Sequence, residues 1–385
     1  MKLLFCGDIV IEDPLRFKIS TTLQDVISSH DIKCCNLEAP VVDDAMHRSK
    51  LIKAGPVIHQ TSESLQLLSE VGFNLVTLAN NHIMDYGAFG LKKTHNACVH
   101  YKMRAIGAGF SFEHAYTPHV IVDEQNRRIA ILNYGEAGFG ALISRGGGYA
   151  WINHINTVNT VNKVSKSCDV TIVVCHGGLE GVDTPLPEWQ NCYRKLVDSG
   201  ADVVIAHHPH IVQGIETYKE KKIFYSLGNF YFDNQYNIGN IEWNRSIIVS
   251  IDSNMQDLVK FYPVQVTDNC IDISTSKSFY NDIHDRSSYL TDRTKLEKRA
   301  NELADDLWAR YYEEYWLSLT HRTDSIMRML KYVAKKVIFR NRLRFDKIDE
   351  TMLLHNLQIE SHRWLCERYL HNKNIENNEH VLIND

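Results

Sequence analysis

Residues 170–178 read VTIVVCHGG and residues 201–210 read ADVVIAHHPH, and these two stretches decide the fold class. Each contains an almost unbroken run of branched aliphatic residues that stops at a histidine. A strand that is apolar on both faces is buried on both faces, as in the parallel sheets of α/β proteins. The two stretches therefore predict buried strands at 170–175 and 202–206, each followed by polar side chains.

Short apolar runs alternate with amphipathic segments on both sides of these strands, as far as about residue 267. Further strands are expected at 3–5, 32–37, 75–78, 128–134, 223–227, 246–251 and 258–266. Helices are expected at 62–70, where Gly72 provides a stop, and at 187–197, where Pro187 occupies the first turn. This alternation predicts an α/β domain over residues 1–270.

The chain changes character towards its C-terminus. Residues 290–319, 325–339 and 350–370 are charged, rich in aromatic residues and spaced as helices. They predict an all-helical C-terminal region over 283–371, followed by a polar tail at 372–385. The aromatic residues of this region are expected to contact the first domain; they are Trp308, Tyr311, Tyr312, Tyr315 and Trp316.

One segment of the helical region is strongly basic. Residues 325–347 interleave apolar side chains with eight lysines and arginines between Arg328 and Lys347, against the single acidic residue Asp346. A basic amphipathic helix of this kind can lie on an anionic membrane surface. The alternative is a solvated helix face that packs on the main domain. The sequence leaves both interpretations open.

Composition limits the function classes. The 385 residues carry a formal net charge of -5, which does not suit a general nucleic-acid binder. The nine cysteines are scattered and odd in number, which argues against a disulfide framework or a structural zinc cluster. No apolar run is long enough to span a membrane. We expect a cytoplasmic protein, with peripheral membrane contact through residues 325–347 left open.

Polar side chains of the types that bind metals follow the predicted strands. They are Asp8, Glu38, Asn81, His82, His176, His208 and His210. In an open α/β sheet the carboxyl ends of the strands form one rim, and ligands bind at that rim. Carboxylate, amide and imidazole groups together suit one or two divalent transition-metal ions, with manganese, iron and zinc all compatible.

Each of these positions also has a simpler explanation when it is taken alone. The His-Pro-His sequence could be an ordinary surface loop, and Asn81 could cap a helix. The glycines beside Asp8 and His176 could merely form turns, and Glu38 could close a strand with a salt bridge. The placement of all these residues at strand ends favours the metal site over the separate explanations.

A series of motifs in order along the chain resembles the CapA family of bacterial capsule synthesis proteins, of the poly-γ-glutamate type. The motifs are Gly7-Asp8, Asn36-Leu37-Glu38, LANNHIMDYG at 78–87, GAG at 107–109, HGG at 176–178, GADVVI at 200–205, HHPH at 207–210 and YSLGNF at 225–230. The resemblance covers roughly the first two-thirds of the chain. That family is similar to calcineurin-like metallophosphoesterases, which implies a four-layer α/β/β/α sandwich with two metal ions.

The resemblance also implies roles for individual residues. The implied metal ligands are Asp8, Glu38 in the bridging position, Asn81, His176, His208 and His210. His82 takes the place of the catalytic histidine that assists the leaving group. The residues expected to contact substrate are Asn80, Glu180, His207 and Asn229.

The chain departs from the pattern of these families at three positions. Metallophosphoesterases usually carry Asp-x-His at the first strand, whereas Val10 stands here in the place of the histidine. One ligand is therefore missing, and His207 and Glu180 are the candidates to replace it. The bridging residue is Glu38 instead of the usual aspartate, and Gly177 stands where CapA-like proteins commonly have tryptophan.

Two functional hypotheses follow from the resemblance. The first is metal-dependent hydrolysis or transfer at phosphorus in capsule or exopolymer biosynthesis, with a phosphoester or the capsule polymer itself (poly-γ-glutamate or polysaccharide) as substrate. The second treats the missing ligand as the sign of a degenerate site. The domain would then be a non-catalytic binding or scaffold module of a polymer synthesis or export complex. The sequence leaves the oligomeric state open.

Overall fold

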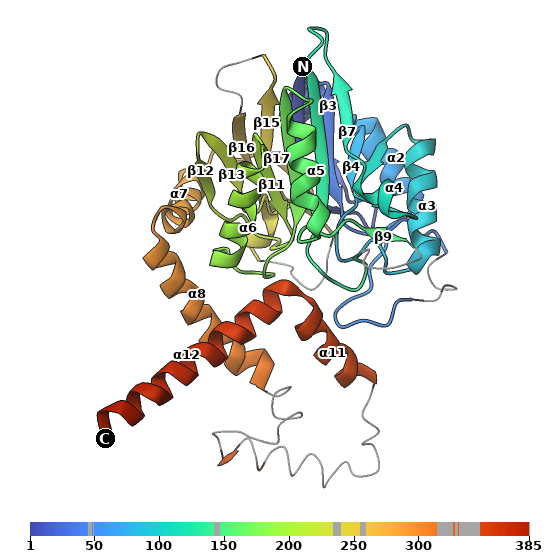
Figure 1. Cartoon of the computed structure of the whole chain (residues 1–385). Coiled ribbons are helices and arrows are strands. Elements are labelled where there is room, and N and C mark those ends of the chain that lie inside the picture. The colour runs from blue at the N-terminus through green and yellow to red at the C-terminus, as the bar shows by residue number, and fades with distance from the viewer. Residues whose placement is uncertain are drawn as a thin grey trace. The chain divides into compact units, whose positions relative to one another are not determined.

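The computed structural model describes residues 1–44, 48, 50–141, 147–233, 240–254, 259–313, 326–327, 330 and 347–384. The chain forms two compact units, one of residues 1–51 and 57–296 and one of residues 52–56 and 297–385. The first unit is α/β, with two large sheets and helices on their outer faces (Figure 1). The α/β class predicted from the sequence is therefore confirmed.

The first sheet has nine strands and is centred on β1 (Lys2–Val10). The strands that continue it in parallel on one side are β3 (Ile32–Leu37), β4 (Leu75–Thr77) and β5 (Arg104–Ile106). The strands on the other side are β15 (Arg245–Asp252), β16 (Val259–Thr267), β17 (Cys270–Ile273) and β2 (Lys18–Ile19). A ninth strand, β14 (Asn229–Phe232), pairs in parallel with the end of β1.

The second sheet has six strands in the order β12-β13-β11-β10-β8-β7. Its parallel strands are β8 (Arg128–Gly135), β10 (Val170–His176), β11 (Val203–His207) and β13 (Lys221–Phe224). Its antiparallel edges are β7 (His119–Val122) and β12 (Ile215–Tyr218). A separate short ribbon joins β6 (Ala108–Gly109) to β9 (Gly148–Tyr149). The two predicted central strands are neighbours, with His176 opposite His207.

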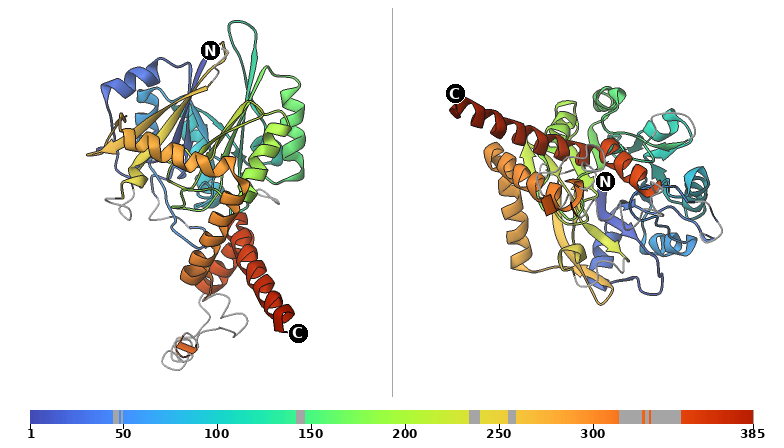
Figure 2. Two further views of the ribbon diagram at one scale, coloured as in Figure 1. Left: turned by 90° about the vertical axis from the view of Figure 1, so that its left-hand side faces the viewer. Right: turned by 90° about the horizontal axis from the view of Figure 1, so that it is seen from below.

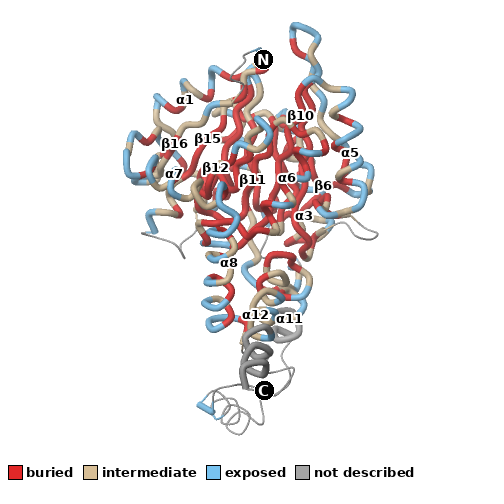
Figure 3. Tube along the Cα trace, turned by 60° about the vertical axis from the view of Figure 1, so that its left-hand side comes forward, coloured by how far each residue is buried: buried red, intermediate tan, exposed pale blue. Residues whose placement is uncertain are grey.

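The core between the sheets explains why the strands are apolar on both faces. Along β1, Leu3 and Phe5 belong to a buried cluster that also includes strand residues of the second sheet. The alternate residues Leu4 and Cys6 belong to a different cluster, on the outer face of the first sheet. Successive side chains of a strand point to opposite faces, so a strand buried on both sides needs apolar residues at every position. Figure 3 shows this buried centre along the strands.

Helices cover the outer faces of both sheets (Figures 1 and 2). Those of the first unit are α1 (Thr21–Ser28), α2 (Ser62–Val71), α3 (Gly87–His100), α4 (Phe112–Tyr116), α5 (Ile155–Ser165), α6 (Pro187–Asp198) and α7 (Lys277–Thr291). Apolar residues of α1, α2 and α3 pack on the first sheet, while α5 and α6 pack on the second. Helix α2 ends at Gly72 in a left-handed conformation, as the sequence predicts.

Two strand boundaries differ from the prediction. β1 does not end at Asp8 but continues to Val10, with a register shift between Cys6 and Asp8. The strand predicted at 223–227 ends at Phe224, and a new strand begins at Asn229. The reason is that residues 225–228 cross from the second sheet to the first. Within the crossing, the Leu227 amide donates to the Ala206 carbonyl of the second sheet, and the Leu227 carbonyl accepts from the Ile247 amide of the first sheet.

The helical C-terminal part begins earlier than predicted. Helix α7 starts at Lys277 and packs against β12, where the hydroxyl of Ser287 accepts a hydrogen bond from the Ile215 amide (2.9 Å). The division into compact units therefore falls after Leu296, later than the boundary at 270–283 that the sequence predicts. The remaining helices are α8 (Arg293–Leu307), a π-helical turn (Trp308–Tyr312), α11 (Lys347–Gln358) and α12 (Glu360–Asn384).

Two aromatic residues of this region have partners within the second unit. Trp308 stacks on Tyr369 with ring centroids 4.3 Å apart, and the Tyr312 hydroxyl contacts His362, so both pack within the second unit. The prediction that these aromatic residues contact the first domain stays a prediction. Helix α12 continues to Asn384, where the sequence predicts a polar tail. Tyr315, Trp316 and most of the basic segment 325–347 lie outside the described residues. None of the described helices has the length and apolar character needed to cross a membrane.

Candidate metal centre

The ends of strands from both sheets bring the predicted ligands together. The first sheet supplies Asp8, Glu38 and Asn81, from β1 and from the loops after β3 and β4. The second sheet supplies His176, His208 and His210, from the end of β10 and the loop after β11. The rim expected on a single sheet is therefore shared between two sheets. All of these residues are buried except Asn81, which is partly exposed.

The first group of possible ligands contains Asp8, Glu38 and His210, whose donor atoms all lie within 4.8 Å of one another. Nδ1 of His210 lies 3.5 Å from Oδ2 of Asp8, and its Nε2 lies 3.6 Å from Oε1 of Glu38. These two distances start from different nitrogens of the ring, and one imidazole offers one of them to a given ion. The group offers hard oxygen donors and one nitrogen, which suits a divalent transition metal.

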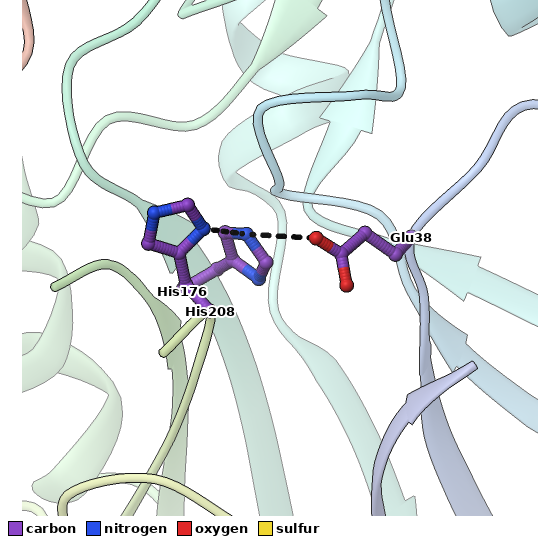
Figure 4. A group of neighbouring side chains, drawn as sticks. All are labelled: Glu38, His176 and His208. Carbon is purple, nitrogen blue, oxygen red and sulfur yellow. Dashed lines mark hydrogen bonds and ion pairs between the residues drawn. The ribbon is translucent and has the colours of Figure 1, made fainter. Parts of the chain in front are cut away.

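The second group contains Glu38, His176 and His208, again within 4.8 Å of one another. Figure 4 shows the Glu38 carboxylate facing the two imidazole rings, with 3.8 Å between its Oε1 and Nε2 of His176. That nitrogen also lies 3.1 Å from Nδ1 of His208 and 2.9 Å from Oδ1 of Asn81. Glu38 therefore belongs to both groups, which is the position a bridging carboxylate occupies in a two-metal site.

The spacing of the donor atoms fits metal ligands. The nitrogen–oxygen distances from Glu38 to His176 and His210 are 3.8 and 3.6 Å, which is too long for hydrogen bonds. Two ligands of one ion, each about 2.1 Å from it, lie about 3.0–3.4 Å apart. The separations within the cluster, from 2.9 to 3.8 Å, lie on both sides of this range, so small adjustments would let these donor atoms surround an ion.

The electrostatics of the cluster favour a cation. Burial lowers the pKa of His176 and of His208 well below the usual range, so both rings are neutral, the form that binds metals. Burial alone would raise the pKa of Asp8, but hydrogen bonds to His207 and His210 outweigh it and hold that pKa well below its usual range. Burial also opposes the charge on His210, but Glu38 and Asp8 raise its pKa to about 10. The two carboxylates therefore attract positive charge to this point.

The backbone of the His-Pro-His loop is strained. His208 has φ 99° and His210 has φ 61°, in the left-handed region that residues with a Cβ rarely adopt. Such conformations cost about 1–3 kcal/mol each and persist where the surrounding structure enforces them, often at functional sites. Here they turn both rings towards the carboxylates of the first sheet.

Two supporting residues were not predicted. Asn36 Nδ2 donates to Oδ1 of Asp8 (2.7 Å) and lies 3.2 Å from Nδ1 of His176, so it fixes both ligands. Glu136 follows β8, and its Oε1 lies 3.6 Å from Nε2 of His208 and accepts a hydrogen bond from the Gly178 amide (3.3 Å). The rule that selected the other residues, a polar side chain directly after a strand, would also have found Glu136.

The predicted catalytic histidine forms a buried pair with a carboxylate. Nδ1 of His82 lies 2.8 Å from Oδ2 of Asp85, and that oxygen also accepts a hydrogen bond from the Ile58 amide (2.9 Å). With Nδ1–H donating to Asp85, Nε2 is the ring nitrogen that remains to exchange a proton. His82 is close enough to His176 for its charge to contribute to the lowered pKa of that ring.

The four residues predicted to contact substrate differ in their burial and in their hydrogen-bond partners. Asn80 is fully buried: its Oδ1 accepts hydrogen bonds from the amides of residues 82 and 83, and its Nδ2 donates to the Leu37 carbonyl. Asn229 Oδ1 lies 3.0 Å from Nδ1 of His210, and His207 Nδ1 lies 3.3 Å from Oδ1 of Asp8. Glu180 is exposed, and its carboxylate is near His208 and His210.

The structure shows the surroundings of two positions, Val10 and Gly177, at which the chain departs from the family pattern. Val10 is fully buried, and its side chain has no donor atom that could bind a metal. At Gly177, an added Cβ would lie 2.7 Å from the ring of Trp189, which therefore occupies the space of any larger side chain at that position.

Comparison with known proteins agrees with the motifs. Residues 2–234 match the family model described as bacterial capsule synthesis protein PGA_cap. The capsule biosynthesis protein CapA of Bacillus anthracis is 32% identical over 216 residues, covering 54% of this chain and 52% of that protein. The PGA biosynthesis protein CapA of Bacillus subtilis is 31% identical over 216 residues, covering 55% of this chain and 56% of that protein.

A more distant relative has the same extent of coverage. A probable polyglutamine synthesis accessory protein of Mycobacterium tuberculosis is 25% identical over 229 residues, covering 56% of this chain and 59% of that protein. The chain thus spans a little over half the length of these curated relatives. Because the family model matches more than half of the chain and includes the whole ligand cluster, this chain belongs to the bacterial capsule synthesis protein family PGA_cap.

Proposed function

We propose that this chain is a metal-dependent hydrolase of the phosphoesterase type that acts in the biosynthesis of a capsule or related exopolymer. The observation that carries the chemistry is the sharing of Glu38 between two ligand groups, one with Asp8 and His210 and one with His176 and His208. Membership of the PGA_cap family, and the capsule and PGA biosynthesis names of its relatives, support the biological role.

We also propose that the first unit has the four-layer architecture of the metallophosphoesterases. The two sheets that face each other, each covered by helices on its outer side, are what a four-layer α/β/β/α metallophosphoesterase-like sandwich would have. Its ligands come from strand ends of both sheets, which is the placement described above for the cluster. A site built between two sheets also keeps most of its ligands out of water, which strengthens their electrostatic interaction with an ion.

A divalent transition metal, bound as one or two ions, would polarise the phosphoryl group and lower the pKa of a bound water towards ~7. Asp8, Glu38, Asn81 and the three histidines at 176, 208 and 210 would hold it. His82 would donate the proton that the leaving oxygen needs when water replaces it at phosphorus. Asp85 would orient His82 and keep the proton of its ring on Nδ1, so that Nε2 faces the reaction.

The direct test is elemental analysis of chain purified without chelator and without a metal-binding tag, beside His208→Ala. We expect one or two transition-metal ions per chain in the parent and a loss of metal in the variant. The loaded protein is then screened against phosphomonoesters and phosphodiesters. Metal-free parent protein with an intact fold would refute the hydrolase and favour the scaffold module, for which Val10 in place of a ligand is the specific observation.

Location and membrane contact belong to the same proposal. A cytoplasmic chain could touch the anionic membrane surface through the basic residues 325–347. Co-sedimentation of the full chain with vesicles containing anionic lipid, at low and high salt, tests this. We expect binding that falls as salt rises, and absence of binding at low salt would remove the idea.

A further inference from the structure

The ligand pattern implied by the resemblance has a gap at Val10. The group formed by Asp8, Glu38 and His210 therefore has only one imidazole. Val10 is fully buried and offers no donor atom. Another side chain near His210 must fill the gap if this metal position is to be held as strongly as the other one.

Glu180 is placed to fill it. Its carboxylate forms a third group with His208 and His210, in which the donor atoms all lie within 4.8 Å of one another. Unlike the other ligands it is exposed, so it would close the site from the solvent side.

The loop that carries Glu180 is fixed against the His-Pro-His loop by its backbone. The amide of Gly177 donates to the His207 carbonyl (3.0 Å), and the amide of Gly181 donates to the Pro209 carbonyl (2.9 Å). Gly178 has φ 136°, which a residue with a Cβ adopts only under strain, and an added Cβ there would lie 3.0 Å from Pro209. The backbone on both sides of Glu180 is therefore held against the His-Pro-His loop.

The end of the loop is fixed as well. Nε2 of Gln213, which is buried, donates a hydrogen bond of 2.7 Å to the carbonyl of Val182. The carboxylate thus begins from a backbone that is bonded on both sides of it. A side chain anchored in this way loses less conformational entropy on binding an ion than one on a loose loop.

His207 is the other candidate, and its surroundings argue against it. Its Nδ1 lies 3.3 Å from Oδ1 of Asp8, so it serves as a partner of a ligand. Among the described residues, none of the three groups able to hold a metal contains His207, whereas one contains Glu180. Buried partners of this kind orient a ligand without binding the ion themselves.

We infer that Glu180 is a metal ligand at the position served by His210, where it replaces the imidazole missing at Val10. This inference rests on the proposed metal site. The position then has three carboxylates, from Asp8, Glu38 and Glu180, and a single imidazole. An oxygen-rich set of this kind suits Mn²⁺ better than an imidazole-rich set does, so Mn²⁺ is a suitable ion for testing this position.

The experiment is titration of the metal-free full chain with Mn²⁺, followed by equilibrium dialysis and by electron paramagnetic resonance. We compare the parent with Glu180→Gln, which keeps size and polarity but removes the charge. We expect two ions per chain and an exchange-coupled spectrum in the parent. In Glu180→Gln we expect the second ion to bind about 10–100-fold more weakly, and the spectrum of an isolated ion to appear.

Two controls make the result specific. Asp183→Asn removes the same charge from the same loop, and His207→Gln removes the rival donor. We expect Asp183→Asn to behave as the parent does. Equal Mn²⁺ affinity in the parent and Glu180→Gln would overturn the inference while leaving the metal site intact. The inference would also fail if Asp183→Asn lost the second ion equally, or if His207→Gln lost it while Glu180→Gln kept it. A parent that binds no metal would refute the proposed function itself.

Discussion

Oδ1 of Asn81 and Nε2 of His176 lie 2.9 Å apart, although Asn81 follows a strand of the first sheet and His176 ends a strand of the second. The contact closes the space between the two sheets at one end. It also brings an amide oxygen to the nitrogen that faces Glu38 and His208. The cluster is therefore a product of sheet packing, and four predictions test what it and its surroundings do.

The two adjacent asparagines should separate metal binding from folding. Asn81→Ala removes a proposed metal ligand whose side chain is partly exposed. We therefore expect lower metal content with little change in the free energy of unfolding. Asn80→Ala removes three hydrogen bonds to buried backbone groups, which should cost about 1–3 kcal/mol of unfolding free energy. Elemental analysis and urea denaturation of both variants check this. Equal destabilisation by both would show that Asn81 is also structural.

His82 and Asp85 should affect rate without affecting metal content. Once a phosphoester substrate is found, we expect His82→Ala to lower kcat about 10²–10⁴-fold, the usual contribution of a positioned general acid. Asp85→Asn should lower kcat less and shift the pH profile, because Asp85 would affect the reaction through its 2.8 Å contact with His82. Unchanged kcat in His82→Ala, with metal intact, would rule out the proposed acid.

Gly7 should tolerate no side chain. An added Cβ would lie 2.0 Å from the carbonyl oxygen of Gly228, at the shift of register that lets β14 pair beside Asp8. We expect Gly7→Ala to destabilise the fold by about 3 kcal/mol. Gly87→Ala is the control: its φ is 57° but nothing lies within 4 Å, so strain of about 1 kcal/mol is expected. Thermal denaturation by circular dichroism ranks the two, and the reverse order would contradict the model of β1.

Acid should loosen the second unit through His362. Burial, and the charge of His355, lower the pKa of His362 to about 3, whereas an unfolded histidine has a pKa of about 6.5. The unfolded chain therefore binds the proton more readily, so stability is complete above about pH 6.5 and falls as the pH drops towards 3. Between pH 7 and pH 5 we expect a loss of about 2 kcal/mol.

Hydrogen exchange in α12, corrected for the intrinsic effect of pH, measures this change. His362→Gln cannot take up a proton and provides the comparison, although it alters the contact with the Tyr312 hydroxyl. We expect a smaller difference between pH 7 and pH 5 in the variant than in the parent. The same pH response in both proteins would assign the effect to another group.

Much of the first unit could be predicted from the sequence because its signals are local. The unbroken apolar runs at 170–175 and 202–206 correspond to strands β10 and β11, and the segment ending at Gly72 corresponds to helix α2. These signals reflect burial on both faces and the conformational preference of glycine, which each depend on a few neighbouring residues.

Polar side chains directly after strands also identified most of the cluster. The same rule could have found Glu136, which follows β8 in the same way. It could not have found Asn36, which lies inside β3 and is a partner of Asp8 only because β1 and β3 are adjacent in parallel. The partners of the aromatic residues in the second unit could not be predicted either. Trp308 stacks on Tyr369 because two helices that are far apart in the sequence pack together.

The sequence by itself determined the class of fold, the identity of the ligand-type residues and the missing histidine at Val10. Only the tertiary structure decided that two sheets share these residues, that Glu38 faces both histidine groups, and that Glu180 lies beside His208 and His210. The physical reason is that hydrophobic pattern and turn chemistry are set within a few residues. The distance between a carboxylate after β3 and an imidazole after β11 depends instead on how two sheets pack across a common core.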